Sequence, residues 1–318
     1  MTRRGFFLFA ALGIAWGIPY LFIKIAVSEL EPAMVVLGRS GLAAVLLLPL
    51  ALFRHEVLAV VRRWKPMLAY TLVEIVLPWY FLSSAEQHLP SSTAGLLLAA
   101  VPLAGVGIAF IMGRPERLSG SNWLGIAVGM LGVAALVGLD VAGSDLGAVA
   151  EMAVVVVGYA LGPAILARWM PDLPGIGVVA ISLAAAAVIY VPVVFATSAW
   201  PTAWPSTEVV VSIVVLAVVC SALAFILMVA LIGEIGPVKA TAITYVNPAV
   251  AIAAGVLVLG ERITVWTVVG FVLVLAGSYL VTRHRREPDP APGPEGVSAA
   301  STDLAEPPEP ASDRQADG

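Results

Sequence analysis

The sequence is poor in charged residues and in cysteine. Only 12% of its 318 residues are charged and 60% are hydrophobic, whereas a soluble domain has roughly 25% charged and roughly 45–50% apolar residues. This composition excludes a water-soluble globular protein. The one cysteine, Cys220, lies inside an apolar run, which excludes a disulfide framework and a metal site made of cysteines.

Histidine is also scarce, and the net charge does not indicate a class of binding partner. The three histidines, His55, His88 and His284, fall outside the apolar runs, so we predict neither a buried histidine relay nor a metal site. The net charge of -4 arises in residues 283–318, which hold four arginines and eight acidic residues. This charge balance gives no sign of a nucleic-acid partner.

Long apolar runs dominate what is present. A helix needs about 20 apolar residues to cross about 30 Å of hydrocarbon. Helices are expected rather than strands, because lipid offers no partner to open backbone groups and the runs lack the alternation of barrel strands. The ten predicted transmembrane helices are 6–27, 33–53, 66–85, 93–112, 123–139, 146–168, 175–197, 209–232, 240–259 and 265–282.

The basic residues predict the orientation, since lysine and arginine are retained on the cytoplasmic side of a membrane. With the N-terminus inside, the inner loops hold thirteen lysines and arginines and the outer loops hold only Arg262. This bias requires an even number of crossings. We therefore predict a multi-pass inner-membrane protein with both termini in the cytoplasm.

The two halves of the chain repeat at a spacing near 145 residues. Pro19 recurs 144 residues later as Pro163, and Pro102 recurs 146 residues later as Pro248. Five crossings per repeat, an odd number, put the second repeat in the opposite sense, which accounts for Arg262 on the outer side. We predict a first repeat over 1–139, a second, inverted repeat over 140–282, and a disordered cytoplasmic tail rich in proline and acidic residues over 283–318.

Inverted repeats have a functional implication. A pseudo-twofold axis in the membrane plane lets the two halves exchange inward-open and outward-open shapes around one central site. A transporter needs that exchange and a receptor does not.

Several motifs resemble a known family. Trp16-Gly17, Lys24 and Gly38-Arg39-Ser40 resemble the start of an EamA repeat of the drug/metabolite transporter superfamily. Asn247-Pro248, followed by Gly260-Glu261-Arg262, is similar to the end of such a repeat. The resemblance covers residues 6–282. It implies a ten-helix bundle with a central cavity that moves small solutes such as amino acids, sugars or drug-like compounds, often outward, without a cofactor.

Three ionisable residues lie inside predicted spans, where such a group costs at least about 2.5–3.5 kcal/mol and usually faces the protein interior. Lys24 either lines the cavity or extends to the outer headgroups. Arg39 lies deeper, and its guanidinium either holds a substrate carboxylate with two hydrogen bonds or serves as a structural ion-pair partner. Glu74 either couples transport to protons or is a fixed counter-ion for Arg39 or Lys24.

Further polar and aromatic residues are candidates for the cavity wall. Pro102 and Pro248 lie at equivalent positions in spans 4 and 9, where each removes a backbone hydrogen bond and can kink its helix. The hydrogen-bonding candidates of span 9 alternatively bond neighbouring helices, and the aromatic candidates alternatively anchor the protein at the membrane interface. These candidates are Thr241, Thr244, Tyr245 and Asn247 in span 9, and the aromatic residues Trp16, Tyr20, Trp79 and Tyr80.

We expect three further acidic residues to have no direct part in transport. Glu116 and Glu261 each begin a short loop before a helix, whose N-terminal dipole favours a carboxylate. Glu151 is near the outer end of span 6, where we expect it to be solvated.

The favoured function is an alternating-access secondary transporter that exports a small metabolite or drug-like solute, as a monomer or homodimer in the lipid bilayer. Proton coupling and uncoupled, facilitative transport are the alternatives within this class. A membrane enzyme would need a nucleophile with a base, a carboxylate pair or a metal set, and the sequence shows none. A structural or signalling partner would need a soluble domain or long ordered loops, whereas the predicted loops are short.

Overall fold

The computed structural model describes residues 2–111, 120–136, 146–236, 240 and 242–282. Throughout these ranges the chain is helical apart from short connections, and the ranges contain no strand. The all-α fold class predicted from the sequence is confirmed. Glu116, Thr241 and the predicted tail over 283–318 lie outside the described residues.

Helices coincide with all ten predicted spans. Seven stretches are long and apolar enough to cross a membrane, namely Arg3–Ala26, Pro32–Phe53, Trp64–His88, Ser91–Ile108, Leu146–Trp169, Gly175–Ala196 and Thr207–Ile235. Three shorter apolar helices, Gly120–Ala135, Ile243–Leu259 and Val265–Val281, lie at predicted spans 5, 9 and 10. The count of ten complete crossings stays a prediction.

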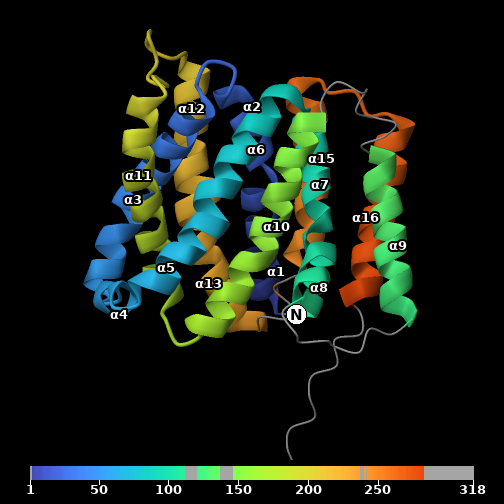
Figure 1. The fold of residues 1–318 in the computed structure, drawn as a ribbon, viewed down its shortest axis with the longest axis horizontal. Coiled ribbons are helices and arrows are strands. Elements are labelled where there is room, and N and C mark those ends of the chain that lie inside the picture. The colour runs from blue at the N-terminus through green and yellow to red at the C-terminus, as the bar shows by residue number, and fades with distance from the viewer. Residues whose placement is uncertain (1, 112–119, 137–145, 237–239, 241, 283–318) are drawn as a thin grey trace, which may run out of the picture. The chain divides into compact units, whose positions relative to one another are not determined.

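Several spans are built from more than one helical element (Figure 1). The elements of the first half are α1 (Arg3–Gly17), α2 (Pro19–Ala26), α3 (Pro32–Phe53), α4 (Val57–Val61), α5 (Trp64–Thr71), η1 (Leu72–Val76), α6 (Leu77–His88), α7 (Ser91–Leu97), η2 (Leu98–Ala100), α8 (Val101–Ile111) and α9 (Gly120–Ala135). Those of the second half are α10 (Leu146–Trp169), α11 (Gly175–Ala196), α12 (Thr207–Ala217), η4 (Val218–Leu223), α13 (Ala224–Ile235), α15 (Ile243–Leu259) and α16 (Val265–Thr282).

The helices of the two halves pair symmetrically. α3 packs on α11, α7 on α15 and α9 on α16, and each pair joins corresponding spans of the two repeats. α6 packs on α10 just as α12 packs on α2, so these contacts also correspond when the two repeats are exchanged. In Figure 1 the pair α3–α11 and the pair α9–α16 lie on opposite sides of the bundle.

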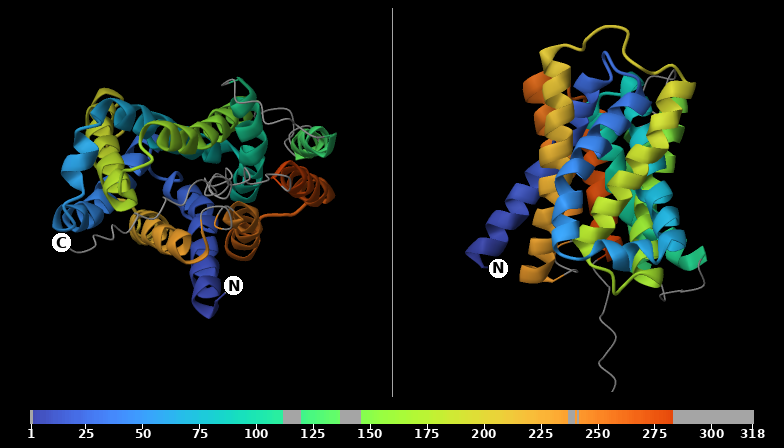
Figure 2. Two further views of the ribbon diagram at one scale, coloured as in Figure 1. Left: turned by 90° about the horizontal axis from the view of Figure 1, so that it is seen from below. Right: turned by 90° about the vertical axis from the view of Figure 1, so that its left-hand side faces the viewer.

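The first spans of the two repeats run in opposite directions. Lys24, near the end of α2, contacts Glu86 near the end of α6. Trp169, at the end of α10, contacts Arg63, which lies just before α5. Because α5 begins span 3 and α6 ends it, spans 1 and 6 finish at opposite ends of the bundle, as inverted repeats require. We call these the Lys24 end and the Arg63 end; Figure 2 (left) looks along the bundle from the end where α4 lies.

Two corresponding spans contain π-helical segments. η1 begins at Leu72 in span 3, and η4 begins at Val218 in span 8, 146 residues later and close to the repeat spacing. Single π-helical turns inside α-helices are rare and frequently mark functional sites. Here the segments contain Glu74 and Ser221, two polar residues of the bundle interior.

Glycines provide the closest helix contacts. A Cβ atom at Gly132 in α9 would lie 2.6 Å from the backbone nitrogen of Val274 in α16. In span 1, Gly13 faces Val246 and Gly17 faces Val250, both on α15. Small residues allow membrane helices to approach closely, and Gly13 and Gly17 provide such a contact between span 1 and α15.

Candidate functional site

Arg39 is a buried cation in the middle of the bundle. It lies in the third turn of α3 and is 6% exposed. Its Nε donates a hydrogen bond of 3.0 Å to the hydroxyl oxygen of Ser221 in η4, and its guanidinium carbon lies 3.7 Å from the ring centroid of Trp79 in α6. The site therefore combines residues of both repeats.

The π-helical turn positions Ser221 for this contact. The Ser221 hydroxyl donates to the carbonyl oxygen of Leu216, five residues earlier, at 2.8 Å, while its oxygen accepts from Arg39. With its proton committed to Leu216, the hydroxyl presents a lone pair to the guanidinium. Ser221 is thus oriented as an acceptor for a cation.

Arg39 has no anionic partner in the described part of the chain. The ion pairs there involve Arg4, Arg54 and Arg63 instead. The alternative that Arg39 serves as a structural ion-pair partner therefore finds no support among these residues. Stacking on Trp79 supplies a cation–π interaction, which is worth about 2 kcal/mol or more when it is desolvated, and within the described residues the guanidinium makes one hydrogen bond, from Nε to Ser221.

Trp79 contacts this cation, and the other aromatic candidates lie elsewhere in the bundle. Tyr20 of α2 is buried and Tyr159 of α10 is half-buried in one apolar cluster. Tyr80 stacks on Tyr190 of α11, with ring centroids 6.4 Å apart. Trp16 of α1 packs edge to face on Phe225 of α13, with ring centroids 5.8 Å apart. Of the aromatic candidates from the sequence, Trp79 is the one with a measured contact to Arg39 among the described residues.

Glu74 is held in η1 against α10. Its Oε2 is buried and has no hydrogen-bond partner among the described residues. It packs on Gly162, where any side chain would overlap the carboxylate. Neither Arg39 nor Lys24 forms an ion pair with it in this part of the structure, so the counter-ion alternative finds no support. Gly162 leaves the space that the carboxylate occupies.

Lys24 has a structural use that the sequence did not indicate. Its Nζ donates to the carbonyl oxygens of Glu86 at 2.6 Å and Leu89 at 2.9 Å. These carbonyl groups lie at the C-terminal end of α6. The helix dipole gives that end a partial negative charge, and its last carbonyl oxygens have no intrahelical donor. The ammonium thus ties α2 to the end of α6 instead of extending freely to headgroups.

Two other carboxylates also bind across the bundle. Glu261 accepts from the backbone nitrogens of Ser91 at 2.7 Å and Ser92 at 3.0 Å. It therefore occupies a helix N-terminus, but that of α7 rather than that of the α16 helix which follows it. Glu151 is half-buried and accepts from the Ser84 hydroxyl at 2.9 Å, so the expectation of a solvated carboxylate is wrong.

Span 9 supplies polar groups of two kinds. Tyr245 donates its hydroxyl hydrogen to the carbonyl oxygen of Ser278 in α16 at 3.2 Å, a helix-to-helix bond. Asn247 keeps a buried Oδ1 that has no partner within the described residues. Pro248 lies inside α15 and Thr244 precedes it on the same helix, whereas Pro102 follows the 3₁₀ turn η2 at the start of α8.

An apolar cavity of about 290 Å³ lies between α8, α9 and α10. Its lining includes Leu103, Met130 and Met152 and contains no charged or polar side chain. None of the sequence-predicted site residues borders it. The candidate site is therefore the Arg39 region, where buried polar groups of different helices meet.

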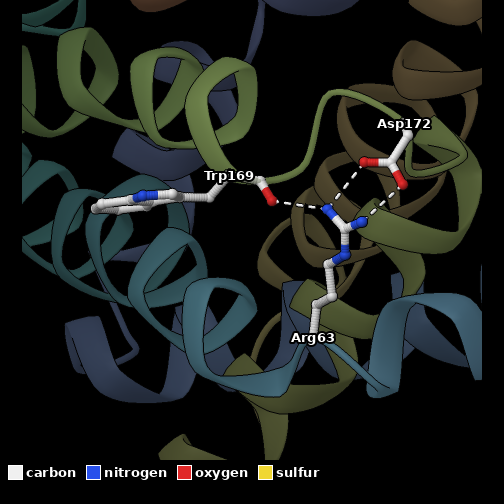
Figure 3. A network of polar contacts seen from close by, with 3 residues as sticks. All are labelled: Arg63, Trp169 and Asp172. Carbon is white, nitrogen blue, oxygen red and sulfur yellow. Dashed lines mark hydrogen bonds and ion pairs between the residues drawn. The ribbon is translucent and has the colours of Figure 1, made fainter.

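The Arg63 end is joined by an exposed polar network (Figure 3). Both terminal nitrogens of Arg63 donate to the Asp172 carboxylate at 2.8 Å, and one also donates to the Trp169 carbonyl at 2.9 Å. Asp172 lies in the connection between α10 and α11. This bidentate pair links the two repeats at that end.

The family comparison agrees with the paired architecture. The model of the EamA-like transporter family matches residues 3–138 and again 147–283. The chain belongs to the EamA-like transporter family. It is thus a multi-pass inner-membrane transporter for a small-molecule substrate, and its EamA repeats account for the symmetric helix pairing.

Curated relatives of this EamA chain carry transporter names. It is 31% identical to "Uncharacterized inner membrane transporter YedA" of Escherichia coli K12, over 85% of this chain and 90% of that protein. It is 24% identical to "Probable amino-acid metabolite efflux pump" of Salmonella typhimurium, over 88% and 95%. A crystal structure that is 19% identical shares the fold with a TM-score of 0.64, over 89% of this chain and 98% of that one.

Proposed function

We propose that this chain exports a small metabolite that carries a carboxylate, by alternating access around Arg39. The observation that carries the proposal is the buried guanidinium of Arg39, which has one hydrogen bond and no anion among the described residues. A planar guanidinium offers two parallel N–H groups that match a carboxylate. The same positive charge disfavours a cationic substrate.

The composition of the site fits alternating access. Arg39 and Trp79 belong to the first repeat, and Ser221 belongs to the second. When two inverted repeats rock against each other, a site at their interface is presented to the two sides in turn. We propose that the N-terminus and the Arg63 end face the cytoplasm, since that end holds Arg54, Arg63 and Lys65.

The direction and the energy source are further parts of this proposal. Export is suggested by the efflux-pump name of the Salmonella typhimurium relative. Glu74 is a second buried group with an unpartnered oxygen, and a carboxylate that gains and loses a proton as the site opens would couple export to proton entry. An uncoupled carrier would use Arg39 in the same way and would not need Glu74.

Efflux from loaded proteoliposomes tests the proposal. The panel pairs each of several amino acids with its carboxamide, which keeps the side chain and removes the negative charge. We expect saturable efflux of at least one carboxylate and no competition by the matching amide. Equal transport of an acid and its amide would refute carboxylate recognition.

A second series of the same assay tests the energy source. An imposed proton gradient should accelerate efflux through the wild-type protein, and Glu74→Gln should abolish that acceleration while efflux down the solute gradient persists. If gradient-driven efflux is unchanged in Glu74→Gln, Glu74 is not the coupling group.

A further inference from the structure

Glu86 is a buried carboxyl group that the proposed function does not use. It lies in the last turn of α6 and is 0% exposed. Neither of its side-chain oxygens has a hydrogen-bond partner within the described ranges. An ionised carboxylate in such a place is far more costly than a neutral one, so the arrangement favours the protonated acid.

The charged and titratable groups near Glu86 belong to four segments of the chain. They are Lys24 and Tyr20 of α2, Arg39 of α3, Tyr159 of α10 and Glu261 of the connection before α16. Lys24 would favour ionisation and Glu261 would oppose it. However, Lys24 is already bonded to the two carbonyl oxygens that end α6, and it forms no ion pair with the Glu86 carboxylate. The buried acid is therefore not neutralised by a partner.

The same residues join α2 to α6 at the Lys24 end. The Nζ of Lys24 joins α2 to α6, and the buried side chains around this contact are apolar, among them Ile23, Leu82 and Leu89. Opening this end requires α2 to separate from α6. Water would then reach Glu86, where an exposed glutamate is ionised at neutral pH, and the released Lys24 ammonium could pair with it.

We propose that Glu86 and Lys24 form a proton-dependent latch, in which Glu86 takes up one proton from the adjoining solution when the Lys24 end closes and releases it when that end opens. The inference rests on the proposed function, because it assumes alternating access. It adds a proton-binding group at one end of the bundle, separate from Arg39 and Glu74.

Thiol labelling in intact cells tests the latch without knowledge of the substrate. The reporter is Ala94→Cys in a Cys220→Ser background, since Ala94 is 0% exposed in the same apolar cluster. A membrane-impermeant maleimide should label it only when the Lys24 end opens. Trp204→Cys, at a position 91% exposed in the connection before α12, corrects for the pH dependence of the thiol reaction.

With Glu86 in place, the corrected labelling rate should fall as the outer pH is lowered from 8 to 6, by up to about tenfold per unit, because protonation drives closure. Glu86→Gln, which mimics the neutral acid, should label slowly at every pH. Glu31→Gln should retain the pH dependence, since Glu31 is an exposed carboxylate at the same end without a capping hydrogen bond.

Two results would overturn the latch: labelling that does not change with pH when Glu86 is present, or a pH dependence that survives in Glu86→Gln. The first needs no variant at Glu86, so poor folding of Glu86→Gln leaves the test intact. The substrate proposal fails separately. pH-dependent labelling without carboxylate efflux refutes the substrate alone, and carboxylate efflux with pH-independent labelling refutes the latch alone.

Discussion

Gly132→Ala should destabilise the contact between α9 and α16. The added Cβ would lie 2.6 Å from the backbone nitrogen of Val274 and 2.8 Å from the carbonyl oxygen of Gly270. Ordinary contact begins at 3.4 Å, and backbone atoms cannot rotate away, so the helices must separate by about 0.8 Å, the difference between 3.4 and 2.6. Such overpacking costs about 1–3 kcal/mol.

Gly105→Ala is the matched control in α8. No heavy atom lies within 4 Å of its Cβ position, and replacing glycine with alanine inside a helix gains about 0.5–1 kcal/mol. The same gain applies to Gly132→Ala, so the two variants should differ by the overpacking cost of about 1–3 kcal/mol in the free energy of unfolding, measured by titration with a denaturing detergent in mixed micelles. Equal stability of the two variants would show that α9 and α16 do not approach as closely as described.

Two further predictions concern the Lys24 end. Burial raises the pKa of Glu261, but the hydrogen bonds from Ser92 and Ser91 outweigh burial and hold that pKa below the ordinary value of 4.5. The ionised carboxylate therefore stabilises the folded protein above about pH 4.5, and this stabilisation is lost as the pH falls through the lowered pKa. The melting temperature of Glu261→Gln should accordingly fall less than that of the wild type between pH 6 and pH 4, and parallel curves would contradict this. Lys24→Met should lose two hydrogen bonds from a charged donor, worth roughly 1.5–3 kcal/mol each, and should melt well below the exposed control Lys65→Met; equal melting would refute the role of Lys24 in holding α6.

The positions of the spans could be predicted because they depend on local properties. The length and hydropathy of a run decide whether a helix can cross a membrane, and both are visible in the sequence. The π-helical turns could not be predicted. Pro78 lies two residues after η1, whereas the helix that follows η4, α13, contains no proline. No shared local signal therefore marks the two π-helical segments.

The candidate site was predicted in part. Arg39 and Glu74 lie deep in their apolar runs, and the structure buries the Arg39 side chain and the Glu74 Oε2. The partner of Arg39, Ser221, is 182 residues away in the sequence. Predicting this contact requires knowing how the helices pack and at which heights, which the sequence alone does not give. The role of Arg39 in substrate binding stays a prediction.

Glu86 was missed because of where the apolar run ends. The predicted span 3 stopped at Ala85, and the polar residues Glu86, Gln87 and His88 suggest a loop. In the structure α6 continues to His88 and buries Glu86. The prediction that Glu261 serves the N-terminus of the helix that follows it, α16, was wrong, because its carboxylate accepts from the start of α7 in the other repeat.

The most direct test of the central claim is equilibrium binding of a transported carboxylate to the purified protein, compared between the wild type and Arg39→Lys. Lysine keeps the charge but loses the two parallel N–H donors. A loss of about 1.4–2.8 kcal/mol corresponds to a 10- to 100-fold weaker Kd, which we expect for Arg39→Lys and not for the exposed control Arg168→Lys. Unchanged affinity in Arg39→Lys would contradict the assignment of Arg39 as the carboxylate-binding residue.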